Sequence, residues 1–158
     1  MGQERVGLWA MNLTQPSVWA VRMYRIAHVL WMRRWRWLAL AITCAARIVS
    51  GIEIHPQATI GRRFAISHGF GVVIGETAEI GDDCLILQGV TLGGRHPAHP
   101  RWHPKLGNGV RVGAGAVILG PVTIGDGAQI GANAVVLHDI PAGLTAVGVP
   151  ARVVGSSE

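Results

Sequence analysis

The dominant pattern in this chain is a small aliphatic residue that recurs at every sixth position over most of the C-terminal two thirds. The next residue is usually glycine, and the fifth residue of each six-residue unit (hexad) is usually alanine or valine. The clearest hexads begin at Ile54, Ile60, Ile74, Ile80, Leu106, Val112, Ile124 and Ile130. A period of six fits neither the 3.6-residue period of a helix nor the two-residue alternation of a lone strand. The pattern therefore predicts a solenoid of short strands and turns.

In such a solenoid each hexad supplies one strand and one turn, and three hexads close a triangular coil. The aliphatic residue is expected to point into the prism, together with the fifth residue, which is small because the coil is narrow. The glycine is expected to carry the backbone round the corner with a positive φ. The predicted fold class is mainly β, a parallel β-helix over residues 51–158, with 139–143 and 147–152 capping its open end.

The first fifty residues lack the hexad pattern and predict a short N-terminal α-helical arm, residues 1–50. Pro16 and Ser17 are suited to opening a helix, and an apolar stripe at helical spacing continues to Trp31. A second helix is predicted from about Trp35 to Val49, with Gly51 after it as a stop. Four tryptophans lie between Trp19 and Trp37 on this arm, and we expect them to pack it against the first coil or a neighbouring subunit.

The hexad pattern is interrupted twice, and repeat proteins often carry function where the repeat breaks. Eight positions instead of six separate Ile66 from Ile74, and His68 lies within this insertion. A longer interruption from Gly93 to Lys105 contains three histidines, three prolines and two arginines. A purely structural turn does not need that composition, so both breaks are candidate functional sites.

The residues at the first break suggest general-base chemistry. Glu53 lies about one coil before His68, and a carboxylate bonded to one imidazole nitrogen supports proton uptake by the other. No arrangement of serine, histidine and acid is evident, and neither cysteine lies in a motif. Metal binding by the loop residues His96, His99 and His103 is a further option, but their spacing matches no standard zinc pattern. We therefore expect no metal.

Composition and charge limit the binding partners and the cellular compartment that the sequence predicts. The net charge of +5 comes mostly from arginines, six of them between Arg22 and Arg47 on the helical arm, but no nucleic-acid module accompanies them, and no nucleic-acid partner is predicted. The apolar segment 38–46 is shorter than the ~20 residues of a membrane span. Cys84 occupies a small inward position of a hexad, which favours a reduced thiol in the core. We expect a cytoplasmic protein with no integral membrane segment.

Several longer strings of residues carry a family resemblance from about Tyr24 to Val154. They are Arg25-Ile-Ala-His-Val-Leu-Trp, Gly51-Ile-Glu-Ile-His-Pro, Ile66-Ser-His-Gly, Gly71-Val-Val-Ile-Gly-Glu-Thr-Ala, Leu87-Gln-Gly-Val-Thr-Leu-Gly-Gly, His103-Pro-Lys and Val147-Gly-Val-Pro-Ala-Arg. Together they resemble serine O-acetyltransferases of the hexapeptide-repeat acyltransferase superfamily. The Gly-Glu-Thr-Ala and Gln-Gly-Val-Thr-Leu-Gly-Gly strings are more specific than the hexads, which many acyltransferases share.

The resemblance implies a left-handed β-helix, an exception to the usual right-handed crossover, assembled as homotrimers that in some cases pair into hexamers. It implies acetyl-CoA as co-substrate in the groove between neighbouring prisms. His68 then corresponds to the catalytic base that deprotonates the acceptor hydroxyl, Glu53 to its acidic partner, and His103 to a second catalytic histidine that holds the acceptor or the tetrahedral intermediate.

The same resemblance assigns cofactor-binding and substrate-binding positions. The pantetheine arm is expected along Gly93, Gly94, Ala114 and Ala132, and Arg152 near the CoA phosphates. The acceptor is expected near Ser67, Arg101 and Trp102. Trp102 stands where the family has an arginine suited to the substrate carboxylate, and Ser67 where it usually has aspartate. Arg101 or Arg95 is a possible substitute for that arginine.

Acetyl transfer to L-serine is the leading functional hypothesis. O-acetylation of a sugar, a polysaccharide unit or another metabolite is the alternative, which Trp102 favours because an aromatic ring stacks on a sugar face. A non-catalytic solenoid is a third reading. The family's longer N-terminal helical domain, with its Asp-Pro-Ala segment, has no match here. The C-terminal tail that docks into cysteine synthase has none either, so this docking is not expected.

Overall fold

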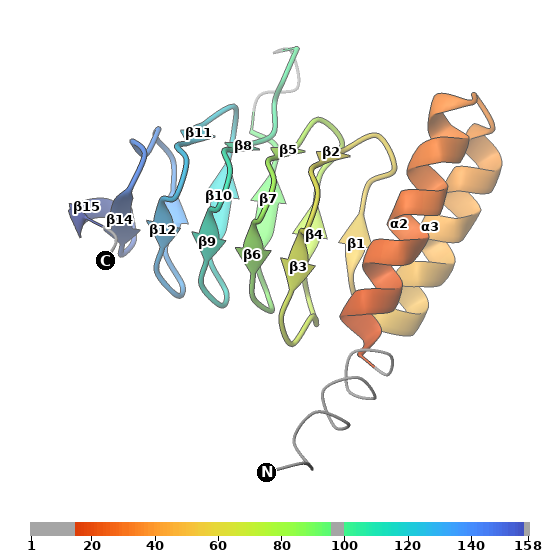
Figure 1. Ribbon diagram of the computed structural model, residues 1–158, viewed down its shortest axis with the longest axis horizontal. Helices are drawn as coiled ribbons and strands as arrows, with labels where there is room; N and C mark the ends of the chain where they lie inside the picture. Colours follow the sequence, from red (N-terminus) through yellow and green to blue (C-terminus); the bar gives the residue numbers. More distant parts are fainter. Residues whose placement is uncertain (1–14, 96–99, 157–158) are drawn as a thin grey trace, which may run out of the picture.

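The computed structural model describes residues 15–95 and 100–156, which form a helical hairpin followed by a coiled triangular prism (Figure 1). Helix α2 (Pro16–Met32) begins at Pro16 as predicted, and α3 (Arg36–Ser50) ends at Gly51, whose φ of 67° confirms the predicted stop. In the described part of the chain, no helix combines the length and the apolar character that a bilayer crossing requires.

The strands form the three sides of the prism, and from β1 to β13 successive strands belong to successive sides (Figure 1). Sheet A has the order β1-β4-β7-β10-β13, sheet B β11-β8-β5-β2 and sheet C β15-β14-β12-β9-β6-β3. The strands are β1 (Glu53–Ile54), β2 (Thr59–Ile60), β3 (Ala65–Ile66), β4 (Val73–Ile74), β5 (Glu79–Ile80), β6 (Leu85–Ile86), β7 (Thr91–Gly93), β8 (Lys105–Leu106), β9 (Arg111–Val112), β10 (Val117–Leu119), β11 (Thr123–Ile124), β12 (Gln129–Ile130), β13 (Val135–Val136), β14 (Leu144–Val147) and β15 (Arg152–Ser156).

The core confirms the predicted left-handed parallel β-helix. The aliphatic residue that opens each hexad is buried, and so is the small fifth residue, including Cys84. Burial of one such aliphatic side chain stabilises the fold by about 1.5–3 kcal/mol relative to exposure. Only β15 breaks the parallel pattern, because it runs antiparallel to β14 and covers the C-terminal edge of sheet C.

Backbone hydrogen bonds from the strands to the neighbouring coil run in one direction, whereas corner amides such as that of Gly71 donate to the preceding coil. The backbone N–H of each strand residue donates to a carbonyl of the next coil, for example Glu53 N to Val72 O and Val73 N to Val90 O, both at 2.9 Å. The carbonyls of each coil therefore accept from the coil before it. As a result, the first coil has a row of carbonyls without a preceding coil to pair with.

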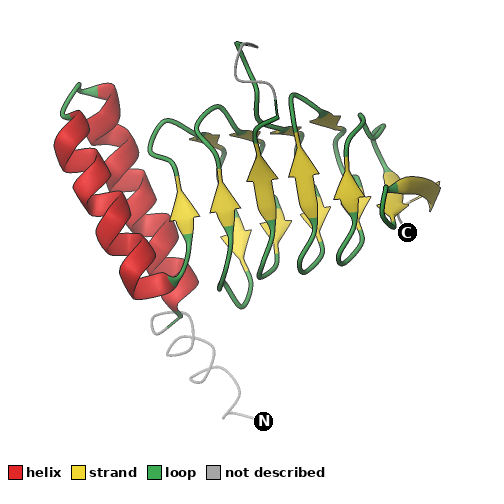
Figure 2. Cartoon of the chain, turned by 180° about the vertical axis from the view of Figure 1, so that it is seen from behind, coloured by secondary structure: helices red, strands yellow, loops and turns green. Residues whose placement is uncertain are grey.

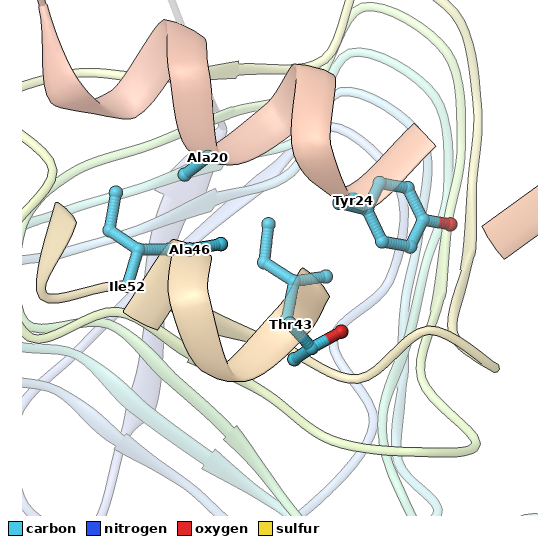
Figure 3. Close-up of a pocket in the computed structure, with 6 residues that line it drawn as sticks. Ala20, Tyr24, Thr43, Ala46 and Ile52 are labelled. Atoms are coloured by element: carbon cyan, nitrogen blue, oxygen red, sulfur yellow. The ribbon is translucent and has the colours of Figure 1, made fainter. Parts of the chain in front are cut away.

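Side chains of helix α2 bond to these carbonyls of the first coil, which explains why polar residues occur on the face of α2 that meets the coil. The Tyr24 hydroxyl donates to Ala58 O at 2.6 Å, His28 Nδ1 lies 2.8 Å from Pro56 O, and Arg25 donates to the carbonyls of Ile60 and Gly61. Burial raises the pKa of Tyr24 to about 12, so its hydroxyl stays a donor. Figure 3 shows Tyr24 beside Ala20, Ala46 and Ile52, where both helices meet the first coil.

The glycine that follows each aliphatic residue is needed for a different reason from the predicted positive φ. Gly61, Gly81 and Gly113 do not have positive φ; a Cβ on Gly81 would lie 2.6 Å from the carbonyl oxygen of Gly107 in the next coil. The expectation of a left-handed glycine at this position was wrong. The left-handed residue comes two positions later and is often not glycine, as at Asp83 (φ 59°) and Asn133 (φ 56°).

Polar side chains stack at the corner between sheets B and C. Asp82 Oδ1 accepts the backbone N–H of Arg62, Asn108 Oδ1 that of Asp82, and Asp126 Oδ1 that of Asn108, at 2.7–2.8 Å. Each side chain thus pairs an amide of the coil before it. This ladder explains why Asp or Asn follows the glycine in these hexads.

Replacing Gly81 with alanine tests the close approach of the coils. Because its Cβ would meet backbone and cannot be relieved by a rotamer change, we expect Gly81→Ala to cost about 1–3 kcal/mol. Gly155→Ala is the matched control, since a Cβ there meets nothing within 4 Å. Thermal unfolding of both variants is the measurement, and an unchanged Tm for Gly81→Ala would contradict the account.

Candidate active site

The functional candidates lie in two columns, one along each edge of sheet A. We call the corner between sheets C and A the His68 edge; it comprises residues 67–71, 87–89, 113–115 and 131–133. We call the corner between sheets A and B the His103 edge; it comprises residues 55–57, 75–77 and the ends of the 93–104 loop. Figure 2 shows the described ends of this loop, drawn in green, extending beyond the tight turns of the other coils.

The His68 corner has an unusual backbone. His68 itself has a φ of 64°, and Gly69 and Gly71 are also left-handed, so the two extra residues are absorbed by a strained turn. The imidazole is exposed and has no hydrogen-bond or ion-pair partner among residues 15–95 and 100–156. Gly69 packs against Ser17 in the first turn of α2 and against Ile52, so the helical arm supports this corner.

The structure does not form the predicted hydrogen bond between Glu53 and His68. Glu53 Oε2 instead lies 3.1 Å from Nη1 of Arg47, which is in the last turn of α3. The permanent charge of the guanidinium attracts a carboxylate more strongly than a neutral imidazole does. Glu53 and His68 do lie toward the same end of sheet A, because Gly71 N donates to Gly51 O at 2.9 Å.

His103 is held in place by the preceding coil. It is 5% exposed, its Nδ1 lies 3.1 Å from the backbone N of Thr77 and 2.9 Å from Thr77 Oγ1, and its ring occupies the space above Gly75. Any side chain at position 75 would overlap the imidazole. The glycine of the Gly-Glu-Thr-Ala string is therefore required for His103 to lie at this edge.

Burial sets the titration of the histidines at the His103 edge. It lowers the pKa of His103, with Glu76 opposing the shift and His55 adding to it. It also lowers the pKa of His55, against the pull of Glu76 and Glu53. Both imidazoles are therefore neutral near pH 7, with the carboxylate of Glu76 close to each.

The loop before His103 is anchored by its own arginine. Arg101 donates to the carbonyls of His103 and Val122 through Nη1 and to that of Pro121 through Nη2, at 2.9–3.4 Å. These bonds give Arg101 a structural task, and its predicted contact with the acceptor stays a prediction. The ring of Trp102 lies over Gly94 and 4.1 Å from the ring of His103. His96 and His99 lie outside the described residues.

A polar recess of about 290 Å³ opens beside His103 on the face of sheet B. Its lining includes Gln57, Thr59, Glu76, Thr77, Glu79 and Arg101. The described residues contain no group of three side chains placed to hold a metal ion. Thr77 and Arg101 in its lining also bond to His103.

The residues predicted to bind the cofactor divide between the two edges. Ala114 and Ala132 lie on the His68 edge, one coil apart, and their short side chains leave the backbone accessible. Gly93 and Gly94 lie on the His103 edge, where Trp102 covers Gly94. Arg152 is exposed in β15. Their contact with acetyl-CoA stays a prediction.

The structure does not bring the two predicted catalytic histidines together within one chain. His68 precedes β4 on one edge of sheet A, whereas His103 lies over Gly75 on the other. A strand advances about 3.3 Å per residue, so the segment 71–75 separates the two edges by roughly 15 Å. One acceptor hydroxyl cannot contact both imidazoles of the same chain at that distance.

Three residues near His103 were missed by the sequence reasoning. Thr77 and Glu76 belong to the Gly-Glu-Thr-Ala string, which carried the resemblance but received no role. His55 belongs to the Gly-Ile-Glu-Ile-His-Pro string, of which only the glutamate was assigned. The available signal was their position: His55, Glu76 and the loop follow sheet A strands in successive coils, so they stack at one edge.

The repeat and the corner sites define a class of protein. Residues 103–138 match the family of bacterial transferases with a hexapeptide in six repeats, so the chain has the architecture of a hexapeptide-repeat transferase. The serine acetyltransferase of Helicobacter pylori is 53% identical over 146 residues, covering 92% of this chain and 85% of the relative. On this identity and coverage, the chain belongs to the serine acetyltransferase family.

Solved structures agree with this assignment. Soybean serine acetyltransferase in complex with serine has a TM-score of 0.87 and 48% identity, covering 90% of this chain and 58% of that one. Serine acetyltransferase of Brucella abortus in complex with coenzyme A has a TM-score of 0.89 and 36% identity, covering 92% and 58%. The chain thus spans little more than half the length of these two structures.

Replacing His68 with asparagine tests whether the backbone at this position is strained, independently of any catalytic role of the imidazole. A left-handed non-glycine residue costs of order 1–3 kcal/mol, and asparagine tolerates this conformation better than histidine. We expect His68→Asn to melt at the wild-type Tm or up to a few degrees above it. Ser67→Ala is the control, because it changes the same turn but leaves the left-handed position 68 unaltered. A Tm of His68→Asn below that of Ser67→Ala would show that the turn is not strained at His68.

Proposed function

We propose that this chain transfers the acetyl group of acetyl-CoA directly to the hydroxyl of L-serine. The observation that carries the proposal is the exposed imidazole of His68, held in a strained turn at the two-residue insertion of a serine acetyltransferase family member. Left-handed residues also occur at ordinary corners such as Asp83, so the insertion and the exposed imidazole are what distinguish this corner.

The reaction needs one base and no covalent enzyme intermediate. His68 takes the proton from the serine hydroxyl as its oxygen attacks the thioester carbonyl. When the tetrahedral intermediate collapses, the carbon–sulfur bond breaks and the proton passes from the imidazolium to the sulfur of CoA. Glu53 supports the charge on His68 once the ion pair with Arg47 rearranges, and His103 contacts the acceptor or the oxyanion.

Both substrates have support from relatives and from this chain. The soybean structure contains serine and the Brucella abortus structure contains coenzyme A. Here Ala114 and Ala132 leave room for an extended pantetheine arm along the His68 edge, and Gly93 and Gly94 line the opposite wall. Arg152, exposed in β15, is the residue that we propose for the CoA phosphates.

We further propose a homotrimer in which sheet A of each prism faces the threefold axis. The His68 edge of one chain then meets the His103 edge of its neighbour, which completes the site that one chain cannot form. In a heterologous interface of this kind, two different edges of the same chain pair and the ring closes. The groove for acetyl-CoA and serine lies between sheets B and C of adjacent chains.

The outward side chains of sheet A fit this arrangement. Beyond Glu53 they are uncharged, and the central ones are Val73, Thr91, Val117 and Val135. Sheet B carries Glu79 and Lys105 at the equivalent positions, paired at 2.9 Å, and sheet C carries Arg111. Burying an uncharged surface costs less desolvation free energy than burying a charged one. Sheet A is therefore the side of the prism best suited to the threefold interface.

The acceptor has a second candidate besides L-serine. The Trp102 ring beside His103 favours a sugar hydroxyl as the second candidate, because aromatic rings stack on sugar faces. Ser67 adds a hydroxyl at the His68 edge. For the compartment we propose the cytoplasm, since Cys44 and Cys84 are both free thiols, and burial raises the pKa of Cys84.

Release of CoA from acetyl-CoA, measured with L-serine and a panel of sugars, tests the activity. We expect turnover with serine, and a loss of about 10²–10⁴-fold in kcat for His68→Ala, because general-base catalysis contributes that much. The variant should keep the oligomeric state of the wild type by light scattering. Turnover with sugars alone would replace serine by the second candidate, and near-normal kcat for His68→Ala would remove His68 as the base.

A further inference from the structure

The Thr77 hydroxyl lies at the centre of the hydrogen bonds that hold His103. Its Oγ1 is 3.1 Å from the backbone N of Trp102, 3.1 Å from the backbone N of His103 and 2.9 Å from His103 Nδ1. A threonine hydroxyl has two lone pairs and one hydrogen. The two backbone N–H groups occupy the lone pairs, so the hydrogen is directed to Nδ1, which accepts it.

A second donor converges on the same nitrogen. The backbone N–H of Thr77 points to His103 Nδ1 at 3.1 Å. Two donors facing one lone pair leave no room for a proton on Nδ1. The hydrogen of the neutral imidazole must therefore be on Nε2.

That Nε2 lies at the surface of the His103 edge. It sits above Gly75, where any side chain would displace it, and it makes no hydrogen bond to the described residues. No fully buried side-chain nitrogen or oxygen in the described part of the chain lacks a partner. Nε2 is therefore reachable from outside even though His103 as a whole is 5% exposed.

We propose that Thr77 is a positioning residue that fixes His103 as its Nε2–H tautomer and directs this N–H into the groove as a hydrogen-bond donor. The role rests on the proposed acetyl transfer, in which the carbonyl oxygen of the thioester gains negative charge as the acceptor attacks. The two histidines then differ in role: His68 removes a proton, whereas His103 stabilises the oxyanion by hydrogen bonding and stays neutral.

The charged and titratable groups around His103 set the expected pH dependence. Glu76 faces it from the corner after β4, His55 from the first coil, and Arg101 from its own loop through the His103 carbonyl. Burial lowers the pKa of His103, and a donor to Nδ1 disfavours the imidazolium further. Loss of the Thr77 hydroxyl therefore raises this pKa, and the acid limb of kcat/KM moves to higher pH.

Kinetics of Thr77→Val and Thr77→Ser test the role. We expect Thr77→Val to lower kcat about tenfold, the value of one hydrogen bond, with KM for acetyl-CoA unchanged and the acid limb shifted to higher pH. Thr77→Ser keeps the hydroxyl and should restore kcat to within about threefold of the wild type. Thr145→Val in β14 is the matched control, and it should behave as the wild type.

The tautomer is measured separately by long-range ¹H–¹⁵N correlation on ¹⁵N-labelled protein, with the His103 signal assigned by its loss in His103→Gln. An unprotonated Nδ1 in the wild type and in Thr77→Ser is expected, and a protonated Nδ1 overturns the proposal. So does Thr77→Val with wild-type kcat and pH profile. Absence of wild-type turnover with every acceptor, with the tautomer as expected, contradicts the proposed function instead.

Discussion

The backbone hydrogen bonding between coils is the constraint on which the rest of the structure depends. Strand amides donate to the next coil and corner amides such as that of Gly71 donate to the preceding one, so consecutive coils are locked in register and equivalent corners stack into columns. The coils approach closely enough that a Cβ on Gly81 would meet the carbonyl of Gly107. The candidate functional residues therefore lie at corners that depart from the repeat. Because equivalent corners stack, these irregular corners lie next to one another.

The direction of the strand hydrogen bonds also explains what the short helical arm does. The first coil has carbonyls that no earlier coil can pair, and Tyr24, Arg25 and His28 donate to them from one helix. The start of that helix also packs Ser17 against Gly69, next to His68. The arm thus closes the open end of the prism and supports the strained corner at which the proposed base lies.

Much of the fold and part of the site could be predicted from the sequence, for identifiable reasons. The six-residue period reports burial directly, so the core and Cys84 were predicted correctly. The break in the period located His68. The role of the glycines was misread, because a close approach between coils leaves no local signal different from that of a left-handed turn. Thr77 was missed because its contact with His103 joins residues 26 positions apart, across a loop of irregular length. The pairing of Glu53 with Arg47 depends on where α3 ends, which the sequence located only approximately.

The central claim is that two chains share each site, with His68 from one and His103 from the next. Co-expression of His68→Ala with His103→Ala chains, purified as mixed trimers through two different tags, tests it most directly. In a mixed trimer two chains of one kind meet one of the other, and one of its three interfaces receives both intact histidines, so we expect about a third of the wild-type activity, far above either variant alone. Activity no higher than that of the separate variants, in trimers shown to contain both chains, would contradict the account.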